Sequence, residues 1–495
     1  MTARTETVLV AGAGIAGLGV ALALGGGDRE ITILDRDPPP PESSPDEAFL
    51  SWERRGATQL RHSHVFLGRL TTLLRERYPD LLDELLRENV YPFPFRDALS
   101  PPLMAKYVPS DGDEDMTILF SRRTTLELVM RRYAARLPGV RFVTDIAVRG
   151  LLSHRDAQGA LVADGLVVER DGVREELRAD IVVDASGRNT AFPEWLRTEG
   201  CEIDEEEAPC GILYYTRHYK LRDGREPPPR DGTPGGGDMG YIKFGVFGAD
   251  NRSFSITLAL PEIETELRKV IMKPEVFDFI CAQIPGCGRW TDPARAEPVG
   301  PVYAMGNLKS VWRHFVKDGT PQALNFFAIG DARMRTNPLY GRGCSAGAVH
   351  AHILRETLDA AADPAERARL VEDKANETLR AFYDVMVKQD LQAIRRAEHE
   401  RNPDYRPGLR ARVAKSFADD AIAPCTRGDL VVQRRLSRAF HMIDHPTAWL
   451  KNPRIMARIF AMWATPKSIK RARGFYPPTF GPDRDAMIAL LGLTA

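Results

Sequence analysis

Short, mostly apolar runs recur along the first part of the chain, and each is followed by a polar or glycine-rich turn. Runs at residues 8–11, 31–34 and 181–183 have the pattern of strands that are buried on both faces. Between them, apolar residues recur at helical spacing over 65–78 and 81–88. Buried strands that alternate with helices predict an α/β domain.

The pattern changes between about Cys210 and Leu260. The segments 212–221, 239–247 and 252–260 alternate between apolar and polar residues, as the strands of a sheet with one covered face do. Beyond residue 361 the chain is helical in pattern and rich in charge. We therefore expect an α+β protein overall, with three parts: a discontinuous α/β domain (1–205 and 300–360), an antiparallel-sheet domain (206–299) and a C-terminal helical region (361–495).

The first turn carries the clearest chemical signal. Gly12, Gly14 and Gly17 follow the first apolar run in G-x-G-x-x-G order, and Asp35 ends the second run. The first glycine allows a tight turn, the second lets backbone approach a pyrophosphate, and the third lets the helix pack closely on the strand. The helix N-terminus stabilises phosphates, and the acid accepts from ribose hydroxyls, so this order predicts a Rossmann-like dinucleotide site. The residues of the predicted site are Gly12, Gly14, Ile15, Ala16, Gly17, Asp35 and Arg36.

Composition narrows the class of protein. The 495 residues include 68 basic and 68 acidic side chains, a balance that argues against a nucleic-acid-binding protein. The six cysteines are dispersed, with no C-x-x-C pair and no Cys/His spacing typical of zinc, so we expect free thiols, a reducing compartment and no metal. Because neither a signal peptide nor an apolar run of membrane-spanning length is visible, we expect a cytoplasmic protein.

A second glycine-rich stretch selects the dinucleotide. An apolar run at 325–329 ends in Gly330 and Asp331, and Pro338, Gly341 and Gly343 precede another helix. An aspartate at a strand end can bind the hydroxyls of a linear sugar alcohol, and glycines let backbone N–H groups approach the edge of a ring. A helix N-terminus stabilises negative charge at that edge. This combination suits the ribityl chain and isoalloxazine ring of a flavin, whereas a nicotinamide protein has no need of such a second site.

Taken in order, these motifs resemble those of flavoprotein monooxygenases of the p-hydroxybenzoate hydroxylase type. The set comprises the G-x-G-x-x-G turn with Asp35, R-x-x-L-E at 123–127, D-A-S-G-R at 184–188, and the stretch 330–343. Within that superfamily the chain is more similar to polyether-type flavin epoxidases and squalene epoxidase, through Q-x-R-H-x-H at 59–64 and N-P-L-Y-G-R-G at 337–343. The resemblance covers about residues 5–355.

The resemblance implies FAD as the cofactor, and insertion of one oxygen atom into an apolar small molecule by epoxidation or hydroxylation, through a C4a-hydroperoxyflavin. Molecular oxygen is then the co-substrate, and NADPH or NADH is the electron source, directly or through a separate flavin reductase. By analogy, Arg123 contacts the FAD phosphates or ribityl chain, Asp331 contacts the ribityl hydroxyls, and Arg61 and Cys344 lie at the cofactor. Two alternatives stay open: an FAD-dependent reductase of the geranylgeranyl reductase type, and a flavin-binding protein without turnover.

Three departures from the family pattern bear on the chemistry. The W-x-W-x-I-P motif of flavin halogenases is missing, and the comparable stretch at 240–245 reads G-Y-I-K-F-G, which argues against a halogenase. The turn at 184–188 carries Ser-Gly where enzymes that meet NADPH directly carry Asp-Gly, which leaves a partner reductase open. Relatives often carry Met-Thr or Asn where this chain has Cys344, Ser345 and Ala346, and without a C-x-x-x-x-C pair we expect Cys344 to be a packing residue.

We expect no catalytic triad, because a flavin carries the difficult chemistry itself. His62 and His64 are the candidate catalytic residues: either they lie near the flavin and tune it, or they bond to backbone at a loop–helix junction. Tyr241, Phe244 and Phe247 either line an apolar substrate pocket or belong to ordinary core, since their spacing is that of a strand.

The segment 451–473 mixes apolar residues with lysine and arginine at helical spacing. A basic amphipathic helix of this kind can lie on a membrane surface. It can equally pack its apolar face on the protein and leave its basic face in solvent. We expect this second arrangement rather than contact with a membrane.

Overall fold

The first domain is built on a five-stranded parallel sheet. The computed structural model describes residues 5–493, and the strand order in this sheet is β19-β9-β1-β2-β5. The strands are β1 (Glu6–Ala11), β2 (Arg29–Leu34), β5 (Val140–Val143), β9 (Ile181–Asp184) and β19 (Phe326–Ala328). The three apolar runs form its central strands because both of their faces are covered. The expected α/β class is confirmed.

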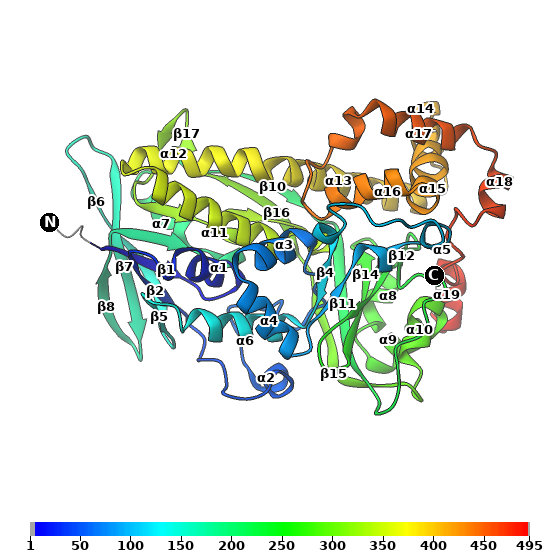
Figure 1. The fold of residues 1–495 in the computed structure, drawn as a ribbon, viewed down its shortest axis with the longest axis horizontal. Coiled ribbons are helices and arrows are strands. Elements are labelled where there is room, and N and C mark those ends of the chain that lie inside the picture. The colour runs from blue at the N-terminus through cyan, green and yellow to red at the C-terminus, as the bar shows by residue number, and fades with distance from the viewer. Residues whose placement is uncertain (1–4, 494–495) are drawn as a thin grey trace.

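Helices cover one face of this sheet, and a small antiparallel sheet covers the other (Figure 1). Val8 and Val10 pack with the helices in one core, whereas Leu9 and Ala11 face a second core on the opposite side. The helices of the first layer are α1 (Ile15–Leu24), α3 (Gly68–Arg77), α4 (Pro79–Arg87), α6 (Arg123–Ala134) and α11 (Gly343–Ala360). The second layer contains β6 (Ala147–Arg155), β7 (Leu161–Arg170), β8 (Val173–Arg178) and α7 (Phe192–Thr198).

A second, antiparallel sheet has the order β12-β13-β14-β11-β15. Its strands are β11 (Ile212–Leu221), β12 (Gly236–Asp238), β13 (Lys243–Gly248), β14 (Ser253–Pro261) and β15 (Ala296–Met305). One face packs on α8 (Thr265–Val270), α9 (Pro274–Gln283), α10 (Pro285–Thr291) and α19 (Arg484–Leu490). Because side chains alternate along a strand, the other face is free to line a site between the two sheets.

Several element boundaries differ from the expectations. The helix expected from Val65 begins at Gly68, because Phe66 forms a β-bridge with Leu119 and holds the preceding residues extended. The strand expected at 239–247 is β13, which begins only at Lys243. β15 pairs with β11 as far as Met305, so the second sheet runs past residue 299.

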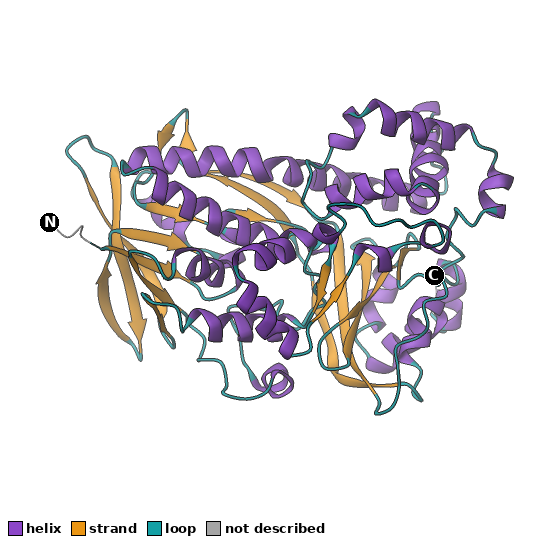
Figure 2. Cartoon of the chain, in the orientation of Figure 1, coloured by secondary structure: helices purple, strands orange, loops and turns teal. Residues whose placement is uncertain are grey.

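Residues 361–493 form only helices and loops, most of which lie at the upper right in Figure 2. Its first helix, α12 (Pro364–Ala375), still packs on α11, and Val371 joins the core of the first domain. The helices that follow are α13 (Ala381–Arg401), α14 (Leu409–Phe417), α15 (Ala423–Gly428), α16 (Leu430–Phe440), α17 (Pro453–Ala464) and α18 (Lys467–Ala472). Within residues 5–493, no helix combines the length and the apolar character that a bilayer crossing requires.

Shorter elements connect these layers. The strands among them pair only with each other, in three small sheets, and the other two elements are short helices. They are α2 (Pro45–Ser51), β3 (Tyr91–Phe93), α5 (Pro101–Met104), β4 (Ile118–Phe120), β10 (Asp204–Pro209), β16 (Lys309–His314), β17 (Val316–Lys317), β18 (Thr320–Pro321) and β20 (Met334–Arg335).

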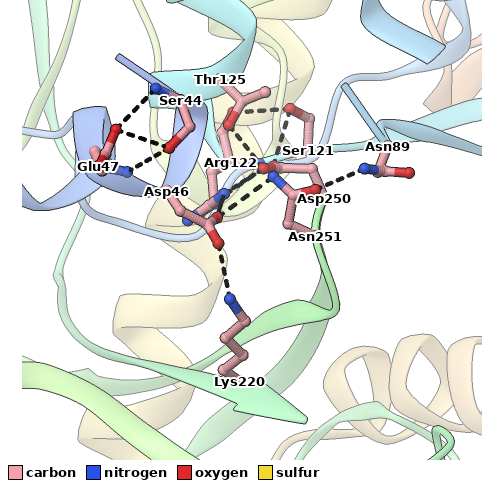
Figure 3. Close-up of polar contacts among 10 residues, drawn as sticks. All are labelled: Ser44, Asp46, Glu47, Asn89, Ser121, Arg122, Thr125, Lys220, Asp250 and Asn251. Atoms are coloured by element: carbon pink, nitrogen blue, oxygen red, sulfur yellow. Dashed lines mark hydrogen bonds and ion pairs between the residues drawn. The ribbon is translucent and has the colours of Figure 1, made fainter. Parts of the chain in front are cut away.

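A buried ion pair joins the start of α6 to the turn between β13 and β14 (Figure 3). Asp250 has no exposed surface, and its Oδ1 accepts from the Arg122 backbone N–H at 2.6 Å while its Oδ2 accepts from Arg122 Nε at 3.0 Å. Thr125 Oγ1 adds a third donor at 2.8 Å. Asp46 of α2 bonds Arg122 from the other side and also bonds Lys220 of β11. The cluster therefore ties the first domain to the second sheet.

Candidate cofactor and substrate cavity

The three glycines of the β1–α1 turn are required for different reasons. Gly12 has φ +108°, and a Cβ there would lie 2.5 Å from the carbonyl oxygen of Ala185. A Cβ on Gly17 would lie 1.9 Å from the carbonyl oxygen of Gly12, so helix and strand pack closely only with glycine there. Gly14 has ordinary extended backbone, and its Cβ would meet nothing nearer than Arg123 Nη2 at 4.0 Å. The fold requires Gly12 and Gly17, while Gly14 keeps open a space outside the turn.

That space belongs to a cavity of about 490 Å³ that extends from the β1–α1 turn to the uncovered face of the second sheet. The cavity brings together most residues that the motifs predicted, although they come from elements far apart in the sequence. The predicted residues in its lining are Gly12, Gly14, Ile15, Ala16, Asp35, Arg36, His62, His64, Arg123, Phe244, Phe247, Gly330, Asp331, Pro338, Gly341, Gly343 and Cys344.

Gly17, Arg61 and Tyr241 lie outside this lining. Gly17 is inside α1, against the turn. Arg61 donates instead to three backbone carbonyls, those of Phe49, Leu50 and Trp52. Its guanidinium therefore satisfies carbonyl groups at the C-terminal end of α2.

The aromatic residues expected in the substrate pocket divide between the two faces of the second sheet. Tyr241 donates its hydroxyl to the carbonyl of Pro482 at 2.8 Å and belongs to the core beneath the helices. The ring of Phe244 packs edge-on against Phe480 in the same core, so this residue contributes little side chain to the cavity. Phe247 lies on the opposite face, over Gly245, because successive residues alternate.

Asp331 follows β19 and offers its carboxylate to the cavity. Burial raises the pKa of this carboxyl, although Arg123 and Arg335 act against the rise. None of residues 5–493 donates a hydrogen bond to the carboxylate. A charged acceptor inside a protein costs free energy unless donors satisfy it, so this side chain fits a ligand that brings hydroxyl groups.

Arg123 is held in the cavity wall by a cluster of charges. Its Nε donates to Glu127 Oε1 at 2.7 Å, and Glu127 also pairs with Arg54 at 3.3 Å. Arg54 further pairs with Asp37 at 3.1 Å and with Asp35 at 3.4 Å. Burial raises the pKa of Asp35 even though Arg54 opposes the rise. Arg54 lines the cavity but was not predicted, because it lies in a polar segment without periodicity, where no local signal marks it.

The two candidate histidines are neutral members of hydrogen-bonded chains. Burial lowers the pKa of His62 to about 4, and the Nδ1 of this ring lies 3.1 Å from Thr216 Oγ1 on β11. The pKa of His64 is also held well below its ordinary value, by burial and then by Arg123. His64 Nδ1 bonds the carbonyl of His62 at 2.9 Å, and both histidines line the cavity.

Cys344 stands in the first turn of α11, close to Arg123 and Asp331. Burial raises the pKa of its thiol to about 11, so the side chain is a protonated thiol at neutral pH. All six cysteines are free. An inert, buried thiol agrees with the expected packing role.

The loop that precedes α11 is anchored by a helix outside the first domain. Tyr214 of β11 donates to the Asn337 side-chain oxygen, and Asn337 Nδ2 donates to Asp390 Oδ1 of α13 at 2.9 Å. Tyr340, which lines the cavity, donates to the same Asp390 oxygen at 2.9 Å. Burial raises the pKa of Asp390 to about 6, in spite of these two donors. The C-terminal region thus fixes the glycine-rich loop from behind.

Asp390 gives the free energy of unfolding a specific pH dependence. Because its pKa in the folded protein is raised to about 6 from an ordinary 3.8, folding favours its protonated form. Its contribution is therefore full below about pH 4 and is lost as the pH rises through about 6. Over that range we expect the wild type to lose free energy of unfolding relative to Asp390→Asn, as measured in denaturant titrations. Glu398→Gln, an exposed change on the same helix, is the control, and a flat difference for Asp390→Asn would contradict the raised pKa.

Among known proteins, the sequence has a distant relative. No family model matches the sequence. The protein Rv3254 of Mycobacterium tuberculosis (strain ATCC 25618 / H37Rv) is 26% identical over 377 residues, which span 72% of this chain and 73% of that protein. Its name states no activity, and the identity is too low to place this chain in a family.

Solved structures give a broader likeness. The p-nitrophenol 4-monooxygenase PnpA of Pseudomonas putida DLL-E4 superposes with TM-score 0.57 and 16% identity, over 89% of this chain and 99% of that one. The Diels-Alderase PyrE3 superposes with TM-score 0.58 and 17% identity, over 89% of this chain and 81% of that one. The flavin-dependent brominase Bmp2 superposes with TM-score 0.53 and 18% identity, over 83% of this chain and 93% of that one. The chain has the fold of the flavin-dependent monooxygenases and halogenases.

Proposed function

We propose that this protein is an FAD-dependent monooxygenase that inserts one oxygen atom from molecular oxygen into a small, largely apolar molecule. One observation carries the proposal: a single cavity joins the dinucleotide turn to the uncovered face of the second sheet, with the unpartnered Asp331 carboxylate in its wall. A nucleotide-binding protein without chemistry has no need of a continuous space of this kind. Hydroxylation and epoxidation are both proposed outcomes.

The residues of the cavity fit FAD. Gly14 and the N-terminus of α1 would hold the pyrophosphate, and Asp331 would accept from the ribityl hydroxyls. Gly341, with φ +64°, and Gly343 would let the backbone approach the ring edge, where the N-terminus of α11 stabilises negative charge. FAD supplies the electron transfer to oxygen; the chain binds it, orients it and excludes water.

The face of the second sheet that lines the cavity, across from the proposed FAD site, offers hydrogen-bond acceptors. Thr257 donates its only hydroxyl proton to Ser63 at 2.8 Å, so in the 2.7 Å bond between Thr257 and Thr216 the donor is Thr216. Both threonines line the cavity, and each keeps one free lone pair. We therefore propose a substrate that is apolar in bulk and carries an O–H or N–H group.

A double variant that lacks both hydroxyl groups tests this preference. With 1-naphthol and naphthalene as probes, we expect the wild type to bind the hydroxylated probe about tenfold more tightly or better, and Thr216→Val with Thr257→Val to lose that difference. Quenching of probe fluorescence measures both affinities. Thr357→Val, a buried threonine outside the cavity lining, is the control. Equal affinities in the wild type would contradict a donor-bearing substrate.

The proposed activity is tested on the purified protein in two steps. A visible absorbance spectrum, before and after reconstitution with FAD, tests whether the protein binds this cofactor. A protein that takes up no flavin would contradict the proposal. NADPH or NADH is then added without oxygen. Bleaching of the flavin indicates direct reduction, while reduction only with an added flavin reductase indicates a partner protein. Reoxidation under labelled oxygen, with mass spectrometry of a converted substrate, separates a monooxygenase from a reductase, whose product carries no label.

A further inference from the structure

The cavity reaches solvent at two places that differ in character. Beside the dinucleotide turn, the exposed residues of its lining are mostly polar and include Arg36 and Asn189. Lys309 belongs to the same group, because Arg335 donates to the carbonyls of both Lys309, at 2.7 Å, and Arg188, at 3.1 Å. This polar opening, defined by Arg36, Asn189 and Lys309, adjoins the space in which we place FAD, so the bound cofactor would lie across it.

The second opening is apolar. Pro338 and Leu339 of the glycine-rich loop and Phe440 at the end of α16 line the cavity and are exposed, Leu339 to 38% and Phe440 to 44%. A single exposed apolar side chain is ordinary on a protein surface, but several around the opening of a cavity are typical of a binding site for an apolar molecule. These three residues are called here the apolar mouth.

The loop side of the mouth rests on the segment that precedes α3. A Cβ on Gly341 would lie 3.5 Å from the carbonyl oxygen of Val65 and 3.7 Å from Leu67 Cδ2. Val65 and Tyr340 both pack on the core cluster that contains Leu67. Because Tyr340 also donates to Asp390, the backbone on this side of the mouth is held in place.

Phe440 is held beside the same segment through its neighbour His441. His441 Nδ1 accepts from the Gly68 N–H at 3.0 Å, and the His441 carbonyl accepts from the Arg69 N–H at 3.1 Å. Burial lowers the pKa of His441 to about 4, so the ring is neutral at neutral pH and keeps this acceptor. The backbone at Phe440 is therefore fixed, whereas its half-exposed ring has room to change rotamer, as exposed side chains do within nanoseconds.

We propose that the substrate passes into and out of the cavity between Leu339 and Phe440, and that the ring of Phe440 sets the size of the molecules that pass. The inference rests on the proposed function, because it requires an apolar substrate that binds inside the cavity. With FAD across the polar opening, the apolar mouth is the path that stays available. An apolar molecule that passes between these side chains keeps part of its surface out of water on the way in, which lowers the barrier to entry.

Stopped-flow quenching of probe fluorescence, on the full-length protein reconstituted with FAD, tests the mouth. With 1-hydroxypyrene as the probe, we expect Phe440→Trp to slow association and dissociation alike, by about tenfold each, and Phe440→Ala to speed both. The dissociation constant should change little, because a residue at the entrance alters the barrier equally in both directions and does not touch the bound molecule. The smaller 1-naphthol should be affected less. Leu339→Ala, on the other side of the mouth, should act like Phe440→Ala.

Two controls separate the mouth from general effects on the protein. Phe279→Ala removes a ring of α9 that is 38% exposed and lies outside the cavity lining, and it should keep the wild-type rates. FAD uptake should be equally fast in the wild type and in Phe440→Trp, because the cofactor uses the polar opening. The proposal is overturned by wild-type probe rates in the Phe440 variants, by a change in the dissociation rate alone, or by FAD-loaded protein that binds neither probe. If the protein takes up no FAD, the proposed function fails instead, and the same rates measured on the apoprotein still test the mouth.

Discussion

Replacement of Asp250 by alanine is expected to lower the free energy of unfolding by about 3 kcal/mol or more. The change removes a carboxylate without exposed surface and leaves the Arg122 guanidinium buried with only Asp46 to pair with. An unpaired charge inside a protein loses its hydration without compensation, which is why breaking one side of a buried pair costs more than the pair contributes. Thermal and denaturant unfolding of the purified variant measure the loss.

A second substitution distinguishes the unpaired charge from lost packing. In Arg122→Met with Asp250→Ala no buried charge is left unpaired, because the half-exposed Asp46 still pairs with Lys220. We therefore expect part of the stability to return. Asp419→Ala, which breaks the exposed pair with Lys415, should change the unfolding midpoint little. An Asp250→Ala protein with a midpoint like that of the wild type would show that the cluster does not hold the two domains together.

Gly14→Val is expected to abolish FAD binding, with a loss of affinity of about 100-fold or more, and to leave the fold intact. The backbone of Gly14 is extended, a conformation that valine adopts readily, and the added Cβ meets no atom closer than Arg123 Nη2 at 4.0 Å. The valine side chain therefore fills the space in which we place the pyrophosphate, without touching the turn. Fluorescence titration of the apoprotein with FAD measures the affinity, and circular dichroism checks the fold.

Two other glycine-to-valine substitutions serve as controls for Gly14→Val. Gly408→Val introduces the same side chain where a Cβ meets nothing within 4 Å, and it should bind FAD normally. Gly17→Val should instead destabilise the protein, because its Cβ collides with the Gly12 carbonyl. If Gly14→Val binds FAD like the wild type, the pyrophosphate does not lie at this turn, and the cofactor placement fails.

The sequence by itself determined the features that depend on neighbouring residues. The spacing of Gly12, Gly14 and Gly17 predicted the turn, because each glycine answers a steric demand of the chain within a few residues. The apolar runs predicted the central strands, because a strand covered on both faces needs apolar residues throughout. Asp331 was predicted from its place at the end of such a run, and the structure leaves its carboxylate open to the cavity.

Tertiary structure alone decided which side chains meet. Arg54 enters the charge cluster of the cavity wall from an irregular segment, and Asp390 reaches the glycine-rich loop from a helix about fifty residues later in the chain. Tyr241 and Arg61, which sequence patterns assigned to the site, donate instead to backbone carbonyl groups outside it. Local patterns set backbone conformation and burial, whereas the direction of a polar side chain depends on partners supplied by distant segments, and these exist only once the domains have packed together.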